Sequence, residues 1–566
     1  MCGIFCLFPR SNPSVNCPGN FGDIYEEHFR DTLNRRGPDY AKSYTFQGIF
    51  FAAHVLWHQG GDLCPQPIED EHGILIFNGD LFMDEITVAK SDTSWLLDAL
   101  SRCSSSEDVK NLLRILTGPF CFVYYQKSSR SLLFCRDILG RNSLLIGVKE
   151  DSVVLTSAGE KSSEYNLIEV PPLGLYEILW DAGEMKISFW DEMISCTNYF
   201  LTEEAFLKSH IESKGMKYSS TKDFINPVWL EKHSMEFDYS FKVIFEGISK
   251  EPPDQLLQRG QSLIFPVIKK LIGLLETSVR DRVTTTVKRC KNCLRNSDAS
   301  HCNHAKVGIL FSGGIDCSIL AILADKFIPR DTGIDLLNVA FEKNTPKGKE
   351  IDWNVPDRQS AKEALEELKR VCPERTWNLI EVNVAKEEKT ECLTKNVCHL
   401  IYPRNTILDE SLGVALWFAA RAEDNSTCRV LLIGSGADEL FGGYTRHRVA
   451  FDRGGEESLK QELENDWARL PSRNLARDDR VICDHGVTQR SPFIEERLVS
   501  FLLHLQPLQK CFPPLGPGVG DKTLLRICGY HLGLRKTAWR GKKALQFGSR
   551  VANSQQNAND ISQFLT

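Results

Sequence analysis

No apolar run in this sequence is long enough to cross a bilayer, and no excess of positive charge marks it for nucleic acid. Runs such as 4–8 and 411–420 fall far below the roughly 18–20 apolar residues of a membrane helix. The 68 Lys and Arg residues are outnumbered by 75 Asp and Glu, which gives a formal net charge of -7. Such a chain has no global basic field. We therefore expect neither a membrane nor a nucleic-acid partner.

Cysteine is abundant, but the sequence lacks a disulfide framework. The 19 cysteines are odd in number and follow no repeated spacing, which is typical of reduced thiols in a cytosolic protein. The start of the chain also lacks the basic segment of a signal peptide. We expect an unanchored, cytoplasmic protein. At 566 residues the chain is too long for one ordinary core, so at least two domains are expected.

The first domain is predicted over residues 2–190. Short apolar runs alternate there with turn residues, which indicates an α+β domain of stacked antiparallel sheets with few helices. The candidate strands are 4–8, 48–53, 74–77, 120–125, 132–135, 153–156 and 174–179. Residues 191–262 turn polar, contain Pro252-Pro253 and show no convincing period. They are predicted to form a linker or an insertion.

The second domain is predicted over residues 263–550. Apolar residues recur at helical spacing from Val267 to Val283, and buried-strand candidates then alternate with helices. This alternation indicates an α/β domain with a parallel sheet. The predicted strands are 307–311, 336–341, 379–384 and 430–433, with helices at 316–326, 360–371 and 411–422. Residues 551–566, rich in Asn, Gln, Ser and Asp, are predicted to be a disordered tail.

Two segments carry most of the chemistry. If Met1 is removed, Cys2 holds both a thiol nucleophile and a free α-amino group, whose pKa near 8 lets it act as a base. Far downstream, a predicted strand runs into the glycine-rich turn Ser312-Gly313-Gly314, which can aim backbone N–H groups at phosphate. It is not a Walker A loop, because Gly-Lys-Ser/Thr is missing. Amide hydrolysis and nucleotide chemistry in one chain suggest a two-step enzyme.

The N-terminal half resembles the class II glutamine amidotransferases, whose N-terminal residue is the nucleophile. The resemblance is carried, in the order of that family, by Cys2-Gly3-Ile4, Arg36-Gly37-Pro38-Asp39, Asn78-Gly79-Asp80 and Ser91-Asp92-Thr93. It implies a thioester at Cys2 and an oxyanion held by the Asn78 side chain and the Gly79 N–H. It also implies that Asp80 and Asp92 bind glutamine, Asp92 through the substrate ammonium.

The C-terminal half resembles the synthetase domain of the asparagine synthetase family. The turn at Ser312 is similar to the PP-loop of ATP pyrophosphatases, and Gly434-Ser435-Gly436-Ala437-Asp438 to that family's second nucleotide loop. The resemblance implies that ATP and Mg²⁺ are bound, with Asp316 and Asp438 as hard oxygen ligands of the metal. Lys542 would be the counter-charge for departing pyrophosphate. The ATP site implied by the resemblance comprises Phe311, Ser312, Gly313, Gly314, Asp316, Ser318, Ala340, Gly434 and Lys542.

Taken together, the resemblance places the chain in a divergent branch of the asparagine synthetase family. It implies that ammonia from glutamine crosses an enclosed passage, lined by apolar side chains, to a carboxylate activated as an adenylate. Aspartate is the expected acceptor, AMP and pyrophosphate the co-products, and a homodimer is possible. The alternative is a family member with impaired catalysis that acts as a binding or regulatory protein.

Two departures from the family keep that alternative open. The family's Arg that grips the glutamine carboxylate is absent from residues 53–58. His58 is either a partial substitute or a surface histidine. Asn405 takes the place of a glutamate essential for adenylation, and an amide cannot act as a base. Asp409 or Glu410 could stand in if the loop is shifted.

A last pattern lies just before the glycine-rich turn. Cys290, Cys293, Cys302 and His304 present soft ligands at a spacing short enough to close around Zn²⁺. A polar insertion loop is the other interpretation, and the sequence does not decide between the two.

Overall fold

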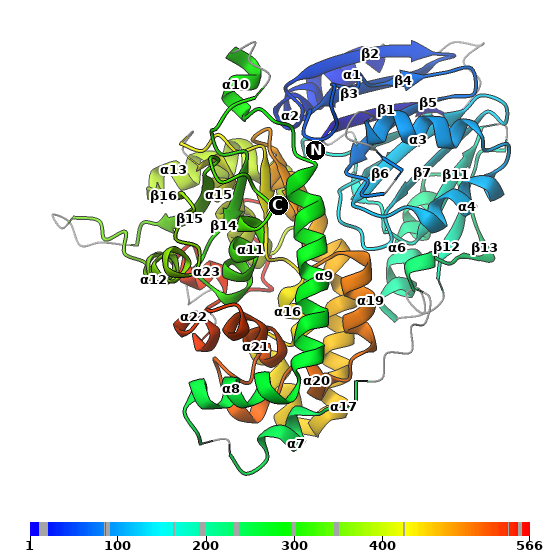
Figure 1. Ribbon diagram of the computed structural model, residues 1–566. Coiled ribbons are helices and arrows are strands. Elements are labelled where there is room, and N and C mark those ends of the chain that lie inside the picture. Colours follow the sequence, from blue (N-terminus) through cyan, green and yellow to red (C-terminus); the bar gives the residue numbers. More distant parts are fainter. Residues whose placement is uncertain are drawn as a thin grey trace.

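The computed structural model describes the chain apart from 14 short gaps, and it has an N-terminal part built on two stacked sheets and a second part built on a parallel sheet (Figure 1). The gaps are residues 11–20, 84, 87–90, 162–164, 181, 192–197, 231–236, 249, 297–300, 344–349, 423–424, 542, 553–556 and 566. Within the described ranges, no helix is both long and apolar enough to cross a membrane.

Two stacked sheets form the N-terminal part, as predicted. The first has the strand order β10-β8-β9-β1-β3-β2, and its neighbours pair antiparallel. Its strands are β1 (Gly3–Pro9), β2 (Tyr40–Phe46), β3 (Ile49–Val55), β8 (Leu145–Val148), β9 (Ser152–Thr156) and β10 (Ile168–Glu169). The second has the order β13-β12-β11-β7-β6-β5-β4. Its strands are β4 (Ile68–Glu69), β5 (Gly73–Gly79), β6 (Phe120–Gln126), β7 (Ser131–Arg136), β11 (Gly174–Leu179), β12 (Glu184–Trp190) and β13 (Lys217–Ile225).

Strand β1 shows why these sheets stack. Its residues are all buried, but they alternate between two cores: Ile4 and Phe8 pack between the sheets, while Phe5 and Leu7 pack toward helices. Those helices are α1 (Phe21–His28) and α2 (Arg30–Arg36), and α3 (Asp92–Ser101) and α4 (Ser106–Ile115) cover the outer face of the second sheet. The result is four layers, in which strands such as β1, β3, β5 and β6 are buried on both faces.

The segment predicted as a linker or an insertion contains helices and a strand. Helix α6 (Asn198–Ser213) is followed by β13, which pairs parallel with β12 and so extends the second sheet. The first domain therefore continues to Ile225, beyond the predicted boundary at 190. Helices α7 (Phe241–Phe245) and α8 (Pro253–Leu263) then pack on the second domain. These elements give only a weak periodic signal in the sequence, because they are mostly polar and each has one weakly apolar face.

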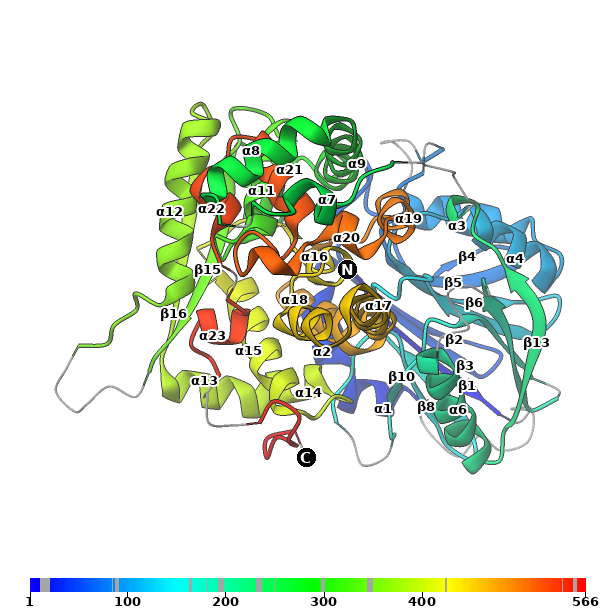
Figure 2. The same ribbon diagram turned by 90° about the horizontal axis from the view of Figure 1, so that it is seen from below.

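The second part is built on a five-stranded parallel sheet, as predicted, with the order β16-β15-β14-β17-β18. Its strands are β14 (Val307–Leu310), β15 (Ile334–Phe341), β16 (Trp377–Val384), β17 (Val430–Leu432) and β18 (Thr488–Arg490). Figure 2 shows helices on both faces of this sheet. One face packs against α9 (Phe265–Thr284) and α11 (Ile315–Asp325), the other against α15 (Ile407–Arg421) and α18 (Ala476–Cys483).

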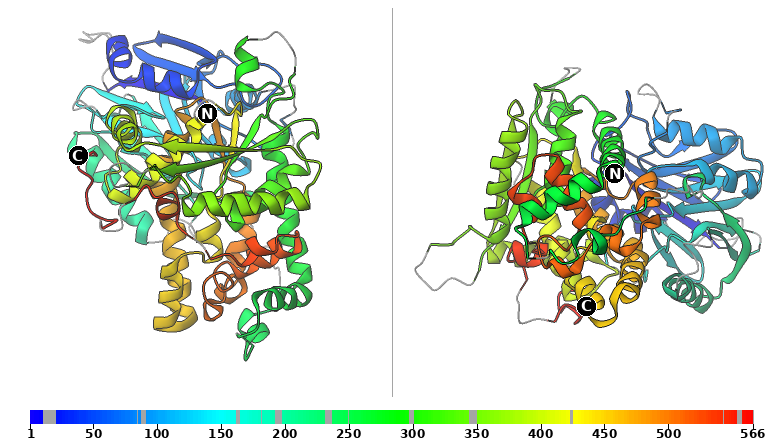
Figure 3. Two further views of the ribbon diagram at one scale, coloured as in Figure 1. Left: turned by 90° about the vertical axis from the view of Figure 1, so that its left-hand side faces the viewer. Right: turned by 60° about the horizontal axis from the view of Figure 1, so that its bottom comes forward.

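Further helices complete the second part. They are α10 (Lys291–Asn296), α12 (Pro356–Val371), α13 (Lys386–Cys392), α14 (Cys398–Ile401), α16 (Ala437–Phe441), α17 (Thr445–Leu470), α19 (Glu496–His504), α20 (Pro507–Lys510), α21 (Thr523–His531), α22 (Lys536–Trp539) and α23 (Leu545–Gly548). The two parts share an extensive interface, and the N-terminus lies within it (Figure 3).

The C-terminal segment is docked, so the prediction of a disordered tail is wrong for its described part. Ile407 and Leu408 donate backbone hydrogen bonds to Asp560 and Ala558. Leu565 is 5% exposed. The polar composition of the C-terminal segment does not reveal this docking, because the segment is held by backbone pairing with residues 405–408 and by a few apolar anchors.

Candidate functional site

Cys2 lies immediately before β1, at the boundary between the two parts. Its side chain is 5% exposed, and Gln66 Nε2 donates to the Cys2 sulfur at 3.8 Å. Gln66 is fixed in turn because its Oε1 accepts from the Phe77 N–H at 2.7 Å. Gln66 escaped the sequence analysis, since no charge or motif singles it out.

The α-amino group beside this thiol belongs to Met1. Met1 is fully buried, and its ammonium donates to Thr488 Oγ1 on β18 at 2.5 Å. Burial lowers the pKa of this amine. Burial also raises the pKa of the Cys2 thiol to about 11, against the opposing effect of the nearby ammonium. Cys2 is thus a neutral thiol while Met1 is present, and only loss of Met1 would give it its own amine base.

Asn78 and Gly79 end β5. Gly79 is required by space, because a Cβ there would come within 2.5 Å of the Pro119 carbonyl oxygen. Asn78 is fully buried; its Nδ2 donates to Cys121 Sγ at 3.6 Å, while its Oδ1 has no partner among the described residues. A buried amide oxygen left unpaired costs about 1–3 kcal/mol, and such groups are typical of functional positions.

Asp80 forms an ion pair with a residue of the second domain. Arg490, the last residue of β18, donates from Nε and Nη2 to the two Asp80 carboxylate oxygens, both at 2.8 Å. His58 Nε2 contacts Asp80 Oδ1 at 2.8 Å. Burial opposes ionisation of Asp80, but Arg490 and His58 hold its pKa far below the usual range. His58 is 4% exposed, so its interpretation as a surface histidine is wrong; it orients Asp80.

Asp92 begins α3 close to this pair. Its carboxylate accepts from the backbone N–H groups of Leu81 at 3.3 Å and Thr93 at 2.8 Å. Burial, together with the negative charge of Asp80, raises the pKa of Asp92 from 3.8 to about 7. A substrate ammonium bound beside Asp92 would stabilise the ionised carboxylate and lower its pKa.

We expect Asp92→Asn to stabilise the protein while weakening any glutamine-dependent activity. The raised pKa means that folding favours the protonated acid, so the wild type loses stability as pH rises from about 4 to about 7. The variant avoids that loss and gains roughly 1–3 kcal/mol at pH 7.5. Unfolding midpoints measured from pH 4.5 to 8 check this. An advantage that shrinks with rising pH would contradict the assignment.

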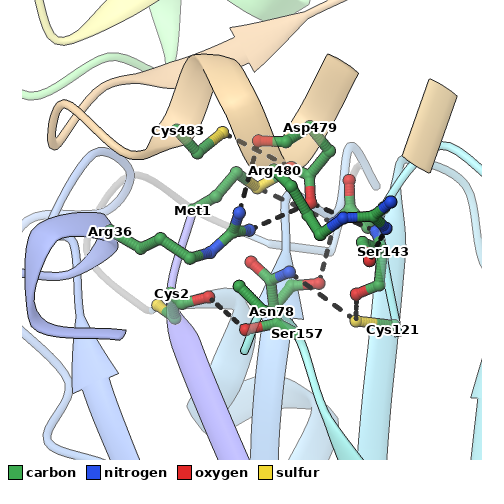
Figure 4. Close-up of polar contacts among 12 residues, drawn as sticks. Met1, Cys2, Arg36, Asn78, Cys121, Ser143, Ser157, Asp479, Arg480 and Cys483 are labelled. Carbon is green, nitrogen blue, oxygen red and sulfur yellow. Dashed lines mark hydrogen bonds and ion pairs between the residues drawn. The ribbon is translucent and has the colours of Figure 1, made fainter. Parts of the chain in front are cut away.

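Charged side chains close the space above Cys2 and Asn78, as Figure 4 shows. Arg36 Nη2 donates to Asp479 Oδ2 at 2.9 Å, and both side chains are fully buried. Arg480 on α18 pairs with Glu169 and donates to Ser143 Oγ at 2.7 Å. The interface next to Cys2 is therefore ionic, which differs from the apolar lining expected for a passage between the domains.

The glycine-rich turn follows β14 as predicted. Gly313 has φ +75°, and a Cβ there would come within 2.2 Å of the Ser360 backbone, so only glycine fits between the turn and α12. Gly314 is the N-cap of α11. Ser318, on the first turns of α11, is fully buried, and its Oγ has no partner among the described residues.

Asp316 and Asp438 converge on one lysine that the sequence analysis missed. Lys522 Nζ lies 2.6 Å from Asp316 Oδ2 and 2.7 Å from Asp438 Oδ1. The lysine side chain is 1% exposed, and although burial disfavours its charge, the two carboxylates raise its pKa. Asp316 Oδ1 is buried without a hydrogen-bond partner among the described residues. Two carboxylates with an orphaned oxygen suit Mg²⁺, a hard cation.

Three of the remaining predicted residues lie on or just after strands of the parallel sheet. Phe311 and Gly434 follow β14 and β17, and Ala340 lies in β15; a Cβ on Gly434 would lie 3.1 Å from the Asp316 Cβ. Lys542 lies outside the described residues. Arg540 nearby donates to the Gly313 carbonyl at 2.7 Å and thereby holds the turn.

Comparisons with known proteins show the family to which the chain belongs. The asparagine synthase family model matches residues 291–454 and 451–562, and the glutamine amidotransferase domain model matches residues 65–161. The chain is 41% identical to asparagine synthetase domain-containing protein CG17486 of Drosophila melanogaster, over 99% of both chains. The chain belongs to the asparagine synthase family. It is also 35% identical to asparagine synthetase domain-containing protein 1 of Homo sapiens, over 98% of this chain and 95% of the relative.

This member of the asparagine synthase family matches both relatives over nearly its whole length. The similarity extends at 26% identity to asparagine synthetase domain-containing protein YML096W of Saccharomyces cerevisiae, over 99% of this chain and 97% of that protein. The names of these three relatives describe a domain and state no activity.

Asn405 and the two carboxylates expected to stand in for the missing glutamate all make contacts within the protein. Asn405 lies where its backbone carbonyl accepts from the Ser562 N–H at 2.8 Å. Asp409 is 2% exposed and pairs with Arg477 at 2.7 Å. Glu410 contacts the Ser562 hydroxyl. Both carboxylates proposed as substitutes are thus engaged in structural contacts.

Proposed function

We propose that the chain is a glutamine-hydrolysing, ATP-dependent amidotransferase of the asparagine synthetase type, acting in the cytoplasm. The observation that carries this proposal is the convergence of Asp316 and Asp438 on Lys522, directly beside the PP-loop turn. Three charged groups from distant segments meet where ligands of parallel sheets bind, at the carboxyl ends of the strands. The 17 described cysteines carry free thiols, which supports a reducing compartment.

In the amidotransferase half, the Cys2 thiol would attack the glutamine amide carbon while the Cys2 amine takes its proton. The Asn78 amide and Gly79 N–H would hold the oxyanion. Collapse releases ammonia, and water then cleaves the thioester to glutamate. Asp92 would pair with the substrate ammonium. The role of the Cys2 amine as the base requires removal of Met1.

In the synthetase half, the N–H groups of the turn at Ser312–Gly314 would bind phosphate oxygens. The acceptor carboxylate attacks the α-phosphorus of ATP, pyrophosphate leaves, and ammonia later displaces AMP from the acyl-adenylate. Asp316 and Asp438 would hold Mg²⁺, which would neutralise charge on the phosphates. Lys522 would then be released from the carboxylates toward the phosphates. Aspartate is the first acceptor to test.

A second candidate function is a binding or regulatory protein without synthesis. It is favoured by the engagement of Asp80 with Arg490 and of Asp409 with Arg477, since neither carboxylate is free for substrate. The two proposals differ in whether ATP is consumed.

The test is pyrophosphate release from Mg-ATP by protein whose N-terminus has been confirmed by intact mass. Aspartate is supplied with glutamine or with ammonium. We expect Asp316→Ala to abolish release in both cases and Cys2→Ala to abolish it with glutamine alone. Asp452→Ala, an exposed carboxylate on α17, and Cys398→Ala are the matched controls. No release from folded wild type under either supply would favour the second candidate.

A further inference from the structure

The segment between α9 and β14 brings four soft ligands together. Cys290 Sγ lies 3.7 Å from His304 Nδ1, and Cys293 Sγ lies 3.3 Å from the same nitrogen. With Cys302, the four ligand atoms all fall within 4.8 Å of one another. Zinc bonds of about 2.0–2.3 Å place tetrahedral ligands roughly 3.6 Å apart. The distances from His304 Nδ1 to the Cys290 and Cys293 sulfurs lie on either side of this value.

The backbone around these thiols is arranged to support thiolates. The Cys290 N–H donates to Cys302 Sγ at 3.2 Å, and the Cys293 N–H donates to Cys290 Sγ at 3.4 Å. Such bonds stabilise the charged form of a ligand. All three cysteines carry free thiols, and Cys290 is fully buried. A polar insertion loop would have no reason to bring four soft ligands within 4.8 Å of one another.

The charge of the surroundings also fits a metal site. Three thiolates and a neutral imidazole around Zn²⁺ leave one net negative charge. Lys288, Arg289 and Lys291 adjoin the ligands in sequence. Lys306 Nζ donates to the Cys302 carbonyl at 2.5 Å. These cations would offset the remaining charge.

We propose that Cys290, Cys293, Cys302 and His304 bind one structural Zn²⁺. Four protein ligands fill a tetrahedral shell, so the site is closed to substrate and stabilises rather than catalyses. The three cysteine ligands bind as thiolates, and any that were protonated release their protons when the metal enters. Three sulfurs and one nitrogen suit Zn²⁺ better than Mg²⁺, which prefers oxygen.

The position of the site suggests what it holds. Upstream, the Val287 N–H donates to the His58 carbonyl at 3.3 Å, which joins this segment to the amidotransferase domain. Within it, the Lys291 N–H donates to the Thr427 carbonyl at 3.0 Å, next to β17. Figure 1 shows α10 beside the amidotransferase sheets. The metal would therefore fix the chain between two domain contacts just before it enters β14.

The test measures metal in the full-length protein purified without chelator. We expect about one zinc per chain by mass spectrometry of the metal, reduced at least tenfold in Cys293→Ser/Cys302→Ser. Cys392→Ser, a half-buried thiol on α13, is the control and should keep its zinc. Hydrogen exchange in residues 287–305 should rise only in the double variant.

A second measurement guards against a double variant that fails to fold. Wild-type protein, stripped of metal and given Co²⁺, should show thiolate charge-transfer bands and the strong visible absorption of tetrahedral cobalt. Absence of both zinc and these bands in folded wild type would overturn the proposal. So would zinc retained in full by the double variant. The outcome is independent of catalysis.

Discussion

Lys522→Met is expected to lower ATP-dependent pyrophosphate release by about 10²- to 10³-fold, the size of effect seen when one preorganised electrostatic contact is lost. Lys522 is the cation on which Asp316 and Asp438 converge. The residue also adopts a left-handed φ of 54°, a conformation that costs a non-glycine residue energy and persists where the surroundings require it. Its position is thus specified by the fold rather than by chance packing.

The melting temperature of Lys522→Met should also depend on Mg²⁺. Without the lysine, two carboxylates of like charge face one another, and their side chains are only 22% and 17% exposed. We expect the melting temperature in chelator to fall by several degrees and Mg²⁺ to restore more of it than in the wild type. Lys536→Met, an exposed lysine on α22, is the control. Equal Mg²⁺ shifts in variant and wild type would contradict the pairing.

Arg490→Met is expected to destabilise the protein by about 3–5 kcal/mol, because it removes the guanidinium from the buried Asp80 carboxylate and leaves His58 as its side-chain partner. Asp80 is fully buried, and both of its oxygens accept from Arg490. The matched control is Arg497→Met, whose arginine is 61% exposed and pairs with Glu495 at 3.2 Å. Because the guanidinium of this second pair lies largely in solvent, we expect it to contribute only about 0–1 kcal/mol. Denaturant unfolding of both variants measures the difference.

The pH dependence separates this pair from general packing. Arg490 and His58 hold the pKa of Asp80 below its unfolded value, so the pair contributes stability above that value, and the contribution is lost as pH falls through the folded pKa. In Arg490→Met the acid can be protonated at higher pH, so the deficit should shrink as pH falls from 7 to 4. The double variant Asp80→Asn/Arg490→Met should recover part of the stability. A deficit that is constant with pH would show a loss of packing alone.

Much of the architecture could be predicted because the signals are local. Runs such as 120–125 and 174–179 coincide with β6 and β11 to within one residue. Helix α9 follows from the recurrence of Val267, Leu271 and Val279, all of them buried. Segments without such periodicity, including β13 and the docked end of the tail, could not be found this way because their neighbours in space supply the stabilisation.

The sequence by itself determined the two domain types, the positions of Cys2 and Asn78, and the glycine-rich turn, since each depends on residues close together in the chain. Only the tertiary structure decided that Lys522 sits between Asp316 and Asp438, and that Asp80 is paired with an arginine 410 positions away. Periodicity and turn chemistry act over a few residues, whereas buried charges are neutralised by whichever partner the folded chain brings within hydrogen-bond distance. That partner is set by packing and leaves no mark in the local pattern.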